Sequence, residues 1–174
     1  KKIKEAESKA NILIVNYPNS FFIYNFLGII LTSQKRYKEA ISNYGKALDI
    51  KKDYPEAYFN LGIVYNKLNN SKKAEECFKY AIKFKADYVE AFNNLGLIFK
   101  SLGRFDDAVK TYEHALKLKP NYTKAQNNLG LTFKEQGKLN EAINLFNDIL
   151  KIYPDNAEAH NNLGNALKDQ GKFE

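Results

Sequence analysis

The sequence predicts an all-α protein made of a 34-residue helix-turn-helix repeat, and three observations carry this prediction. Five Leu-Gly pairs recur at intervals of 34 residues. Apolar residues around each glycine follow the helical period, and an alanine lies twelve residues after four of the glycines. A fixed period of this length indicates a stacked array, because each repeat is one helical unit whose apolar face its neighbours must cover. The glycines are Gly28, Gly62, Gly96, Gly130 and Gly164.

The period divides the chain into blocks, which we number so that each glycine is position 8. Residues 1–20 are predicted to form the second helix of a partial block, and residues 157–174 the first helix of a truncated one. The whole chain is therefore expected to be a single array. Its four full blocks are 21–54, 55–88, 89–122 and 123–156.

The first helix of each block carries its apolar residues at positions 4, 7 and 11. In block 89–122 these are Phe92, Leu95 and Phe99, which at 100° per residue share one face with Gly96. This face is predicted to pack against the rest of the block. A glycine at position 15, suited to the left-handed end of a helix, closes the first helix in three blocks (Gly103, Gly137 and Gly171).

The second helix has small residues at positions 20 and 27 and an aromatic residue at position 24. We expect the glycine at position 8 to let the two helices approach closely, since a side chain there would hold them apart. Proline at position 32 ends the second helix in three places, and Pro55 suits the first turn of the next helix. The aromatic residues at position 24 are Tyr44, Phe78, Tyr112 and Phe146.

These residues resemble the tetratricopeptide repeat, whose pattern the chain follows along its length. The resemblance implies a right-handed α-α superhelix of antiparallel helix pairs, with the first helices lining its concave side. Departures are Leu31 in place of an aromatic, Gln126 and His160 at position 4, and Lys52 and Ala86 in place of proline. The block that matches every position does so with Phe92, Leu95, Gly96, Phe99, Ala108, Tyr112, Ala115 and Pro120.

Asparagine is concentrated on the side of the first helix opposite the packed face. It fills eight of the ten slots at positions 5 and 6, although only 21 of the 174 residues are Asn. Aliphatic residues at position 9 add an apolar strip, and such a strip bordered by amides is typical of a binding groove. We therefore predict a peptide-binding site formed by Asn60, Asn94, Asn128 and Asn162 at position 6, Asn93, Asn127 and Asn161 at position 5, and Ile63, Leu97 and Leu131 at position 9.

An uncharged amide offers two donors and an acceptor, so a column of amides can pair with the backbone of an extended peptide. The column resembles the asparagine ladder in the repeat arm of O-linked N-acetylglucosamine transferases, which implies that position 6 holds a peptide backbone, while Phe26 interrupts the first rung. Alternatively, the amides bond to neighbouring helices and to one another. The carboxylate clamp of chaperone-adaptor relatives is excluded, because positions 5 and 6 are never basic.

Composition and motifs exclude several classes of function. The net charge is +7, but only two of the 27 basic residues are Arg, the residue that phosphate and base contacts favour, so no nucleic-acid partner is expected. No apolar run approaches the length of about 18 residues that a membrane span needs, so no membrane association is expected. A single cysteine fits a reducing compartment, and we expect a cytoplasmic protein.

Nothing in the sequence has the spacing of a catalytic, cofactor or metal site. Cys77 and His160 are expected to be packing residues and His114 to be solvated, so we expect no enzyme, no cofactor and no metal. The predicted function is a non-catalytic scaffold that binds a protein or peptide partner. The alternative is a substrate-recognition arm of a larger enzyme, such as a glycosyltransferase. Self-association through the uncovered ends of the array is a further expectation.

Overall fold

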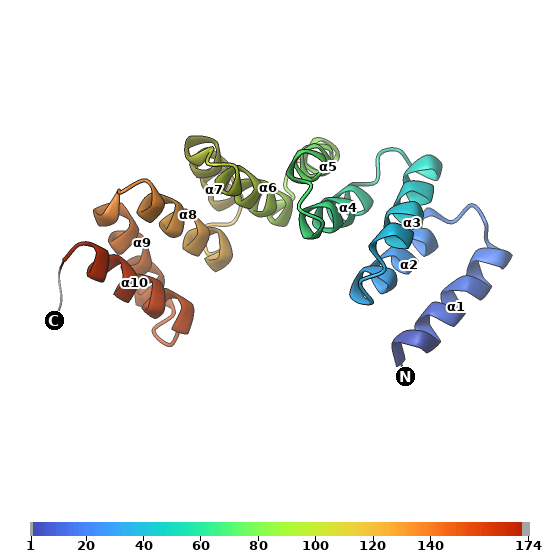
Figure 1. The fold of residues 1–174 in the computed structure, drawn as a ribbon, viewed down its shortest axis with the longest axis horizontal. Helices are drawn as coiled ribbons and strands as arrows, with labels where there is room; N and C mark the ends of the chain where they lie inside the picture. Colours follow the sequence, from blue (N-terminus) through green and yellow to red (C-terminus); the bar gives the residue numbers. More distant parts are fainter. Residues whose placement is uncertain (1, 172–174) are drawn as a thin grey trace. The chain divides into compact units, whose positions relative to one another are not determined.

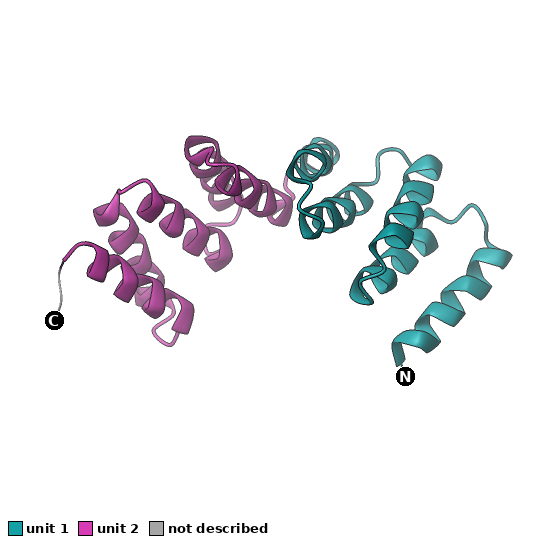
Figure 2. Cartoon of the chain, viewed as in Figure 1, with its two compact units in different colours: residues 1–86 teal, residues 87–174 magenta. Residues whose placement is uncertain are grey.

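Within residues 2–171, which the computed structural model describes, the chain forms ten α-helices and no strand (Figure 1). The all-α fold class predicted from the sequence is confirmed. The chain divides into two compact units, and the boundary between them in the sequence lies between Ala86 and Asp87 (Figure 2). The last residues of the predicted truncated block, 172–174, lie outside the described residues.

Unit 1 holds five helices, and each packs on the next in antiparallel pairs. Helices α2 and α3 form one pair and α4 and α5 another, while α3 packs on α4 and α1 packs on α2. The two first helices, α2 and α4, also touch each other directly. The helices are α1 (Lys2–Asn16), α2 (Phe21–Ser33), α3 (Tyr37–Ile50), α4 (Pro55–Lys67) and α5 (Ser71–Phe84).

Unit 2 repeats this packing. Helices α6 and α7 pair, as do α8 and α9, and α10 packs on α9. The first helices α6, α8 and α10 again touch in sequence, so that side chains at equivalent positions can meet between repeats. The helices are α6 (Val89–Ser101), α7 (Phe105–Leu118), α8 (Thr123–Glu135), α9 (Leu139–Ile152) and α10 (Ala157–Asp169).

The glycine at position 8 permits a close helix approach, as predicted. A Cβ atom on Gly28 would lie 2.5 Å from the Tyr44 ring, and one on Gly130 would lie 2.6 Å from the Phe146 ring. Carbon atoms normally approach to about 3.5–4.0 Å, so a side chain would collide with the ring. At Gly164, by contrast, a Cβ atom would meet no described atom within 4 Å.

The turns between paired helices contain the left-handed residue expected at position 15. Gly103, Gly137 and Gly171 have φ angles of 71°, 76° and 75°. In the first two blocks the same place is held by Lys35 (φ 62°) and Asn69 (φ 56°). Asparagine tolerates this conformation better than most residues, but lysine does not, and the strain is about 1–2 kcal/mol.

The two substitutions at position 4 replace ring packing with hydrogen bonds. Nε2 of Gln126 donates to the carbonyl oxygen of Pro120 at 3.1 Å, and Nε2 of His160 donates to that of Pro154 at 2.8 Å. The packing role expected for His160 is therefore wrong, because its side chain is exposed and contacts the preceding loop. His114 is exposed, as expected, and its ring centre lies 4.4 Å from that of Phe92.

Candidate functional site

The first-helix face of unit 1 contains a groove of about 400 Å³ between α2, α4 and the turn before α3. We call it the unit 1 groove. Tyr44 lies at its base, fully buried, and its hydroxyl is 3.1 Å from Oγ1 of Thr32. Burial raises the pKa of Tyr44 to about 12, so the hydroxyl stays protonated at neutral pH. The groove is lined by Ile29, Thr32, Ser33, Lys35, Tyr37, Tyr44, Asn60, Ile63 and Lys67.

Two of the predicted site residues, Asn60 and Ile63, line this groove. Sequence reasoning missed Lys35, Thr32 and Lys67, which lie one to two turns further along the first helices and in the turn. Comparing positions 12, 13 and 15 between the units would have revealed the two lysines, since unit 1 has no acidic residue at these positions, whereas unit 2 has Glu135 and Asp169.

The amides at positions 5 and 6 bond to each other between adjacent repeats. In unit 1, Nδ2 of Asn60 donates to Oδ1 of Asn25 at 3.1 Å. In unit 2, Nδ2 of Asn128 donates to Oδ1 of Asn93 at 2.9 Å. Each bond runs from position 6 of one first helix to position 5 of the preceding one, so the amides join neighbouring repeats.

The expectation that position 5 faces the groove is wrong for two of its predicted residues. Asn93 and Asn127 are buried, with 5% and 1% of their surface exposed. The reason is that position 5 points toward the first helix of the next repeat, which covers it. Asn161 is exposed, since no described helix follows α10.

The remaining position-6 amides differ from this pattern. Asn94 donates to the backbone oxygen of Glu90 in its own helix at 2.7 Å. Asn162 is 7% exposed, and neither its Nδ2 nor Oδ1 of the equivalent Asn127 has a hydrogen-bond partner among the described residues. Asn162 and Asn127 are therefore not bonded to each other, although they hold the same repeat positions as the bonded pairs.

The predicted apolar strip is half-buried at Ile63, Leu97 and Leu131. It is more exposed at the start of the array, where Ile29 is 44% exposed. Phe22, on the same helix, is 63% exposed. The most accessible apolar surface of the first-helix face thus lies on α2.

Charge at the end of the first helices differs between the two units. In unit 2 two lysines at position 12 pair with an acid at position 13 of the next repeat: Lys100 with Glu135 at 2.9 Å, and Lys134 with Asp169 at 2.7 Å. In unit 1 the residue at position 13 of α4 is Lys67, which forms no ion pair with any described residue.

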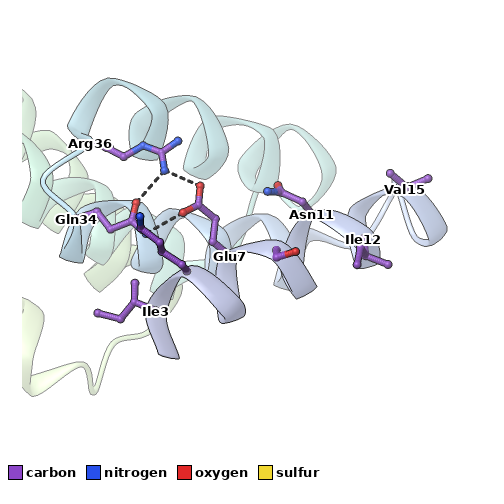
Figure 3. A pocket seen from close by; sticks show the side chains of 9 residues that line it. Ile3, Glu7, Asn11, Ile12, Val15, Gln34 and Arg36 are labelled. Atoms are coloured by element: carbon purple, nitrogen blue, oxygen red, sulfur yellow. Dashed lines mark hydrogen bonds and ion pairs between the residues drawn. The ribbon is translucent and has the colours of Figure 1, made fainter. Parts of the chain in front are cut away.

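A second, larger hollow of about 980 Å³ lies beside α1 (Figure 3). Ile3, Ile12 and Val15 line it, and Val15 is 80% exposed. These three side chains come from α1 alone, and the hollow is open on one side.

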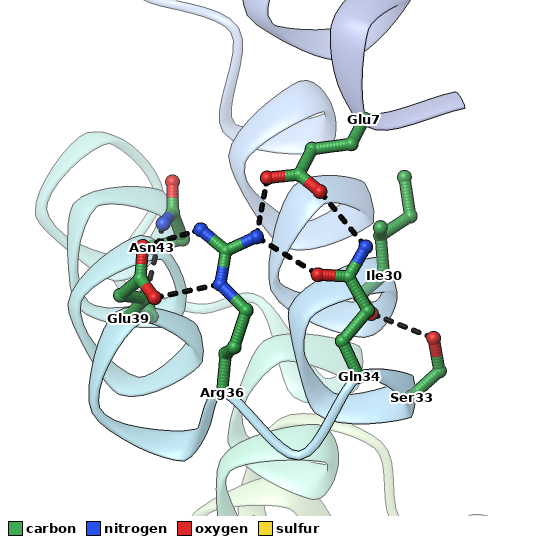
Figure 4. A network of polar contacts seen from close by, with 7 residues as sticks. All are labelled: Glu7, Ile30, Ser33, Gln34, Arg36, Glu39 and Asn43. Atoms are coloured by element: carbon green, nitrogen blue, oxygen red, sulfur yellow. Dashed lines mark hydrogen bonds and ion pairs between the residues drawn. The ribbon is translucent and has the colours of Figure 1, made fainter. Parts of the chain in front are cut away.

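A polar network at the edge of this hollow holds α1 against the rest of unit 1 (Figure 4). Arg36 bonds to Glu7 of α1 and to Glu39, and Nε2 of Gln34 donates to Glu7 at 2.8 Å. The hydrogen bonds from Gln34, and then from Arg36, lower the pKa of Glu7, and Arg36 lowers the pKa of Glu39. Both carboxyl groups are therefore ionised at neutral pH.

Catalytic chemistry finds no support among the described residues. Cys77 is buried, and burial together with the charge of Glu76 raises the pKa of its thiol to about 12. A thiol with this pKa is protonated at neutral pH and is a poor nucleophile. The described residues contain no group of three His, Cys, Asp or Glu side chains placed to hold a metal. None of the described helices combines the length and the apolar character that crossing a bilayer requires.

Comparison with known families decides what the repeat is. A family model described as TPR repeat matches residues 28–69, 96–137 and 132–171, and one described as Tetratricopeptide repeat matches residues 55–88. The chain belongs to the tetratricopeptide repeat (TPR) family. TPR arrays are protein-interaction scaffolds, and this chain has the architecture of one.

Solved structures share the TPR fold with this chain. YrrB, described as a TPR protein with an unusual peptide-binding site, is 24% identical, with a TM-score of 0.77 over 95% of this chain and 85% of its own. MamA is 24% identical, with a TM-score of 0.81 over 90% of this chain and 91% of its own. A TPR protein from Parabacteroides merdae is 19% identical, with a TM-score of 0.86 over 98% and 68%. A search of curated protein sequences found no match.

Proposed function

We propose that this TPR array binds an extended peptide along its first helices, through fixed amide oxygens and a partly exposed aliphatic strip. The observation that carries the proposal is the orientation of Asn60 and Asn128. Each spends one N–H on the preceding repeat, while its Oδ1 accepts no hydrogen bond from the described residues. The amide series is thus both a link between repeats and a source of free acceptors.

The link between repeats favours binding because it holds the amides in place. An asparagine whose Nδ2 is already bonded loses less rotamer freedom when a ligand arrives, which lowers the entropic cost of binding. Its Oδ1 can accept a hydrogen bond from a peptide N–H, a group that every residue except proline carries. Contacts of this kind depend on backbone and therefore tolerate many peptide sequences.

The apolar strip would supply most of the affinity. Ile29 and Ile63 line the unit 1 groove, and apolar surface contributes about 25 cal/mol for each Å² removed from water. Peptide side chains that reach Ile29 would therefore bind more tightly when they are apolar. The peptide-binding site described for YrrB is consistent with a peptide ligand for an array of this fold.

Selection from a random peptide library tests the proposal. A phage-displayed library of 12-residue peptides is panned against the chain, and the enriched peptides are measured by fluorescence anisotropy. We expect Ile29→Ser to weaken their binding by about five- to thirtyfold, because most of a side chain's apolar burial is lost.

The matched control is Ile50→Ser, which changes an isoleucine of similar exposure on α3 that does not line the groove. It should leave the affinity unchanged. Equal losses of affinity in both variants, or enriched peptides whose affinity does not depend on Ile29, would contradict the proposal.

A further inference from the structure

The end of the unit 1 groove carries two lysines that no described residue neutralises. Lys35 and Lys67 both line the groove and both are exposed. None of the described groove-lining residues is acidic, and neither lysine forms an ion pair with a described residue. Ile29 and Ile63 lie in the same groove, so apolar and basic groups are side by side.

Unit 2 provides an internal comparison. There two lysines at the ends of first helices are each neutralised by an acid of the next repeat, since Lys100 pairs with Glu135 and Lys134 with Asp169. In unit 1, Thr32 replaces the lysine at position 12 and Lys67 replaces the acid at position 13. These two differences leave a net positive charge at the unit 1 groove, where Ile29 is exposed and Ile63 is half-buried.

Lys35 adds a separate argument. It occupies the left-handed position, with φ 62°, where the last three blocks have glycine. A lysine is strained there, and this lysine lines the same groove as Lys67. Lysine is thus less favourable than glycine for the backbone at this turn, yet it brings a second positive charge to the groove.

We propose that the unit 1 groove selects peptides in which an apolar residue is followed by aspartate or glutamate. The apolar side chain contacts Ile29 and Ile63, and the carboxylate lies between the ammonium groups of Lys35 and Lys67. This rests on the proposed function and names its ligand class. The two lysines lie about one helical turn or more beyond positions 5 and 6, so this is a different place from the excluded carboxylate clamp.

Panning the displayed random 12-residue library against three proteins tests the proposal. These are the unmodified chain, Lys67→Ser, and Lys72→Ser, which removes the same charge from α5 away from the groove. Ser33 and Ser101 occupy the place in their blocks that Lys67 occupies in its own. We expect the unmodified chain and Lys72→Ser to enrich peptides with Asp or Glu after an apolar residue, and Lys67→Ser to lose that preference.

Affinities then separate charge from fold. An enriched peptide and its Asn/Gln counterpart are titrated by fluorescence anisotropy against the unmodified chain, Lys35→Gly and Lys67→Ser. Each substitution should weaken the acidic peptide about two- to fivefold, the range of an exposed ion pair, and leave the neutral peptide unchanged. Lys35→Gly should at the same time raise the melting temperature, so a loss of affinity cannot be assigned to unfolding.

The outcomes are distinguishable. Peptides that depend on Ile29 but show no acidic preference overturn this inference and leave the proposed function standing. Peptides that do not depend on Ile29 overturn both. A random single-stranded oligonucleotide that binds and loses affinity in Lys67→Ser overturns the inference in favour of a general polyanion site.

Discussion

Alanine at position 8 should have opposite effects in two repeats that share the same sequence pattern. In the helix interior, replacing glycine by alanine stabilises a helix by about 1 kcal/mol. At Gly130 the new Cβ would lie 2.6 and 2.7 Å from two atoms of the Phe146 ring, which is fully buried. The ring would have to move by about 1 Å to restore normal contact, and overpacking of this kind costs about 1–3 kcal/mol.

Gly130→Ala should therefore lower the free energy of unfolding by about 2 kcal/mol, taking the upper end of the overpacking cost. Gly164→Ala should raise it by about 1 kcal/mol, because no described atom lies within 4 Å of the added carbon. Urea unfolding followed by circular dichroism measures both. Native-state hydrogen exchange in α8 and α9 guards against local unfolding, which repeat arrays permit.

If Gly130→Ala is neutral or stabilising, the glycine is not required by the approach of the Phe146 ring, and the explanation of the repeat's most regular residue is wrong. If Gly164→Ala destabilises the chain as much as Gly130→Ala does, the cost lies in the backbone and not in the neighbouring ring.

Three further predictions concern hydrogen bonds. Tyr112→Phe should leave the free energy of unfolding in urea unchanged or raise it by up to about 1 kcal/mol, because the buried Tyr112 hydroxyl has no described partner. Tyr44→Phe should lower it by about 1 kcal/mol, because the bond to Thr32 is lost. Asn128→Ala should lower the free energy of unfolding by about 1–2 kcal/mol, because it leaves Oδ1 of buried Asn93 unpaired. Asn94→Ala should be neutral or slightly stabilising, and equal melting temperatures of the two variants would refute the distinction. Because the pKa of Glu7 is lowered, its contribution to stability is complete above the ordinary value of 4.5 and is lost as the pH falls through the lowered pKa. Hydrogen exchange in α1 should therefore accelerate on acidification, and Glu7→Gln should remove that pH dependence.

The fold followed from the sequence because its determinants are local and repeated. Gly130 and Phe146 are sixteen residues apart, and the same spacing joins Gly28 to Tyr44, so one packing rule is written four times. The left-handed turn residues were recognised only where they are glycine. Lys35 could not be recognised, since lysine gives no signal for a positive φ.

The candidate site was predicted less completely, because helical periodicity gives the face but not the neighbour that covers it. Position 5 was placed on the open side, yet Asn93 lies under the next first helix. The bond from Asn128 to Asn93 joins residues 35 apart, and its existence depends on the offset between two helices. That offset is a tertiary property which the pattern of one helix does not contain.

A heteronuclear NMR titration tests the central claim most directly. The side-chain amide signals of asparagine are followed while an enriched 12-residue peptide is added to the isotope-labelled chain. The account predicts that the signals of Asn60, Asn94 and Asn128, on first helices, shift with the peptide. Those of Asn43 and Asn147, on second helices, should stay in place. Shifts confined to Asn43 and Asn147 would contradict peptide binding on the first-helix face.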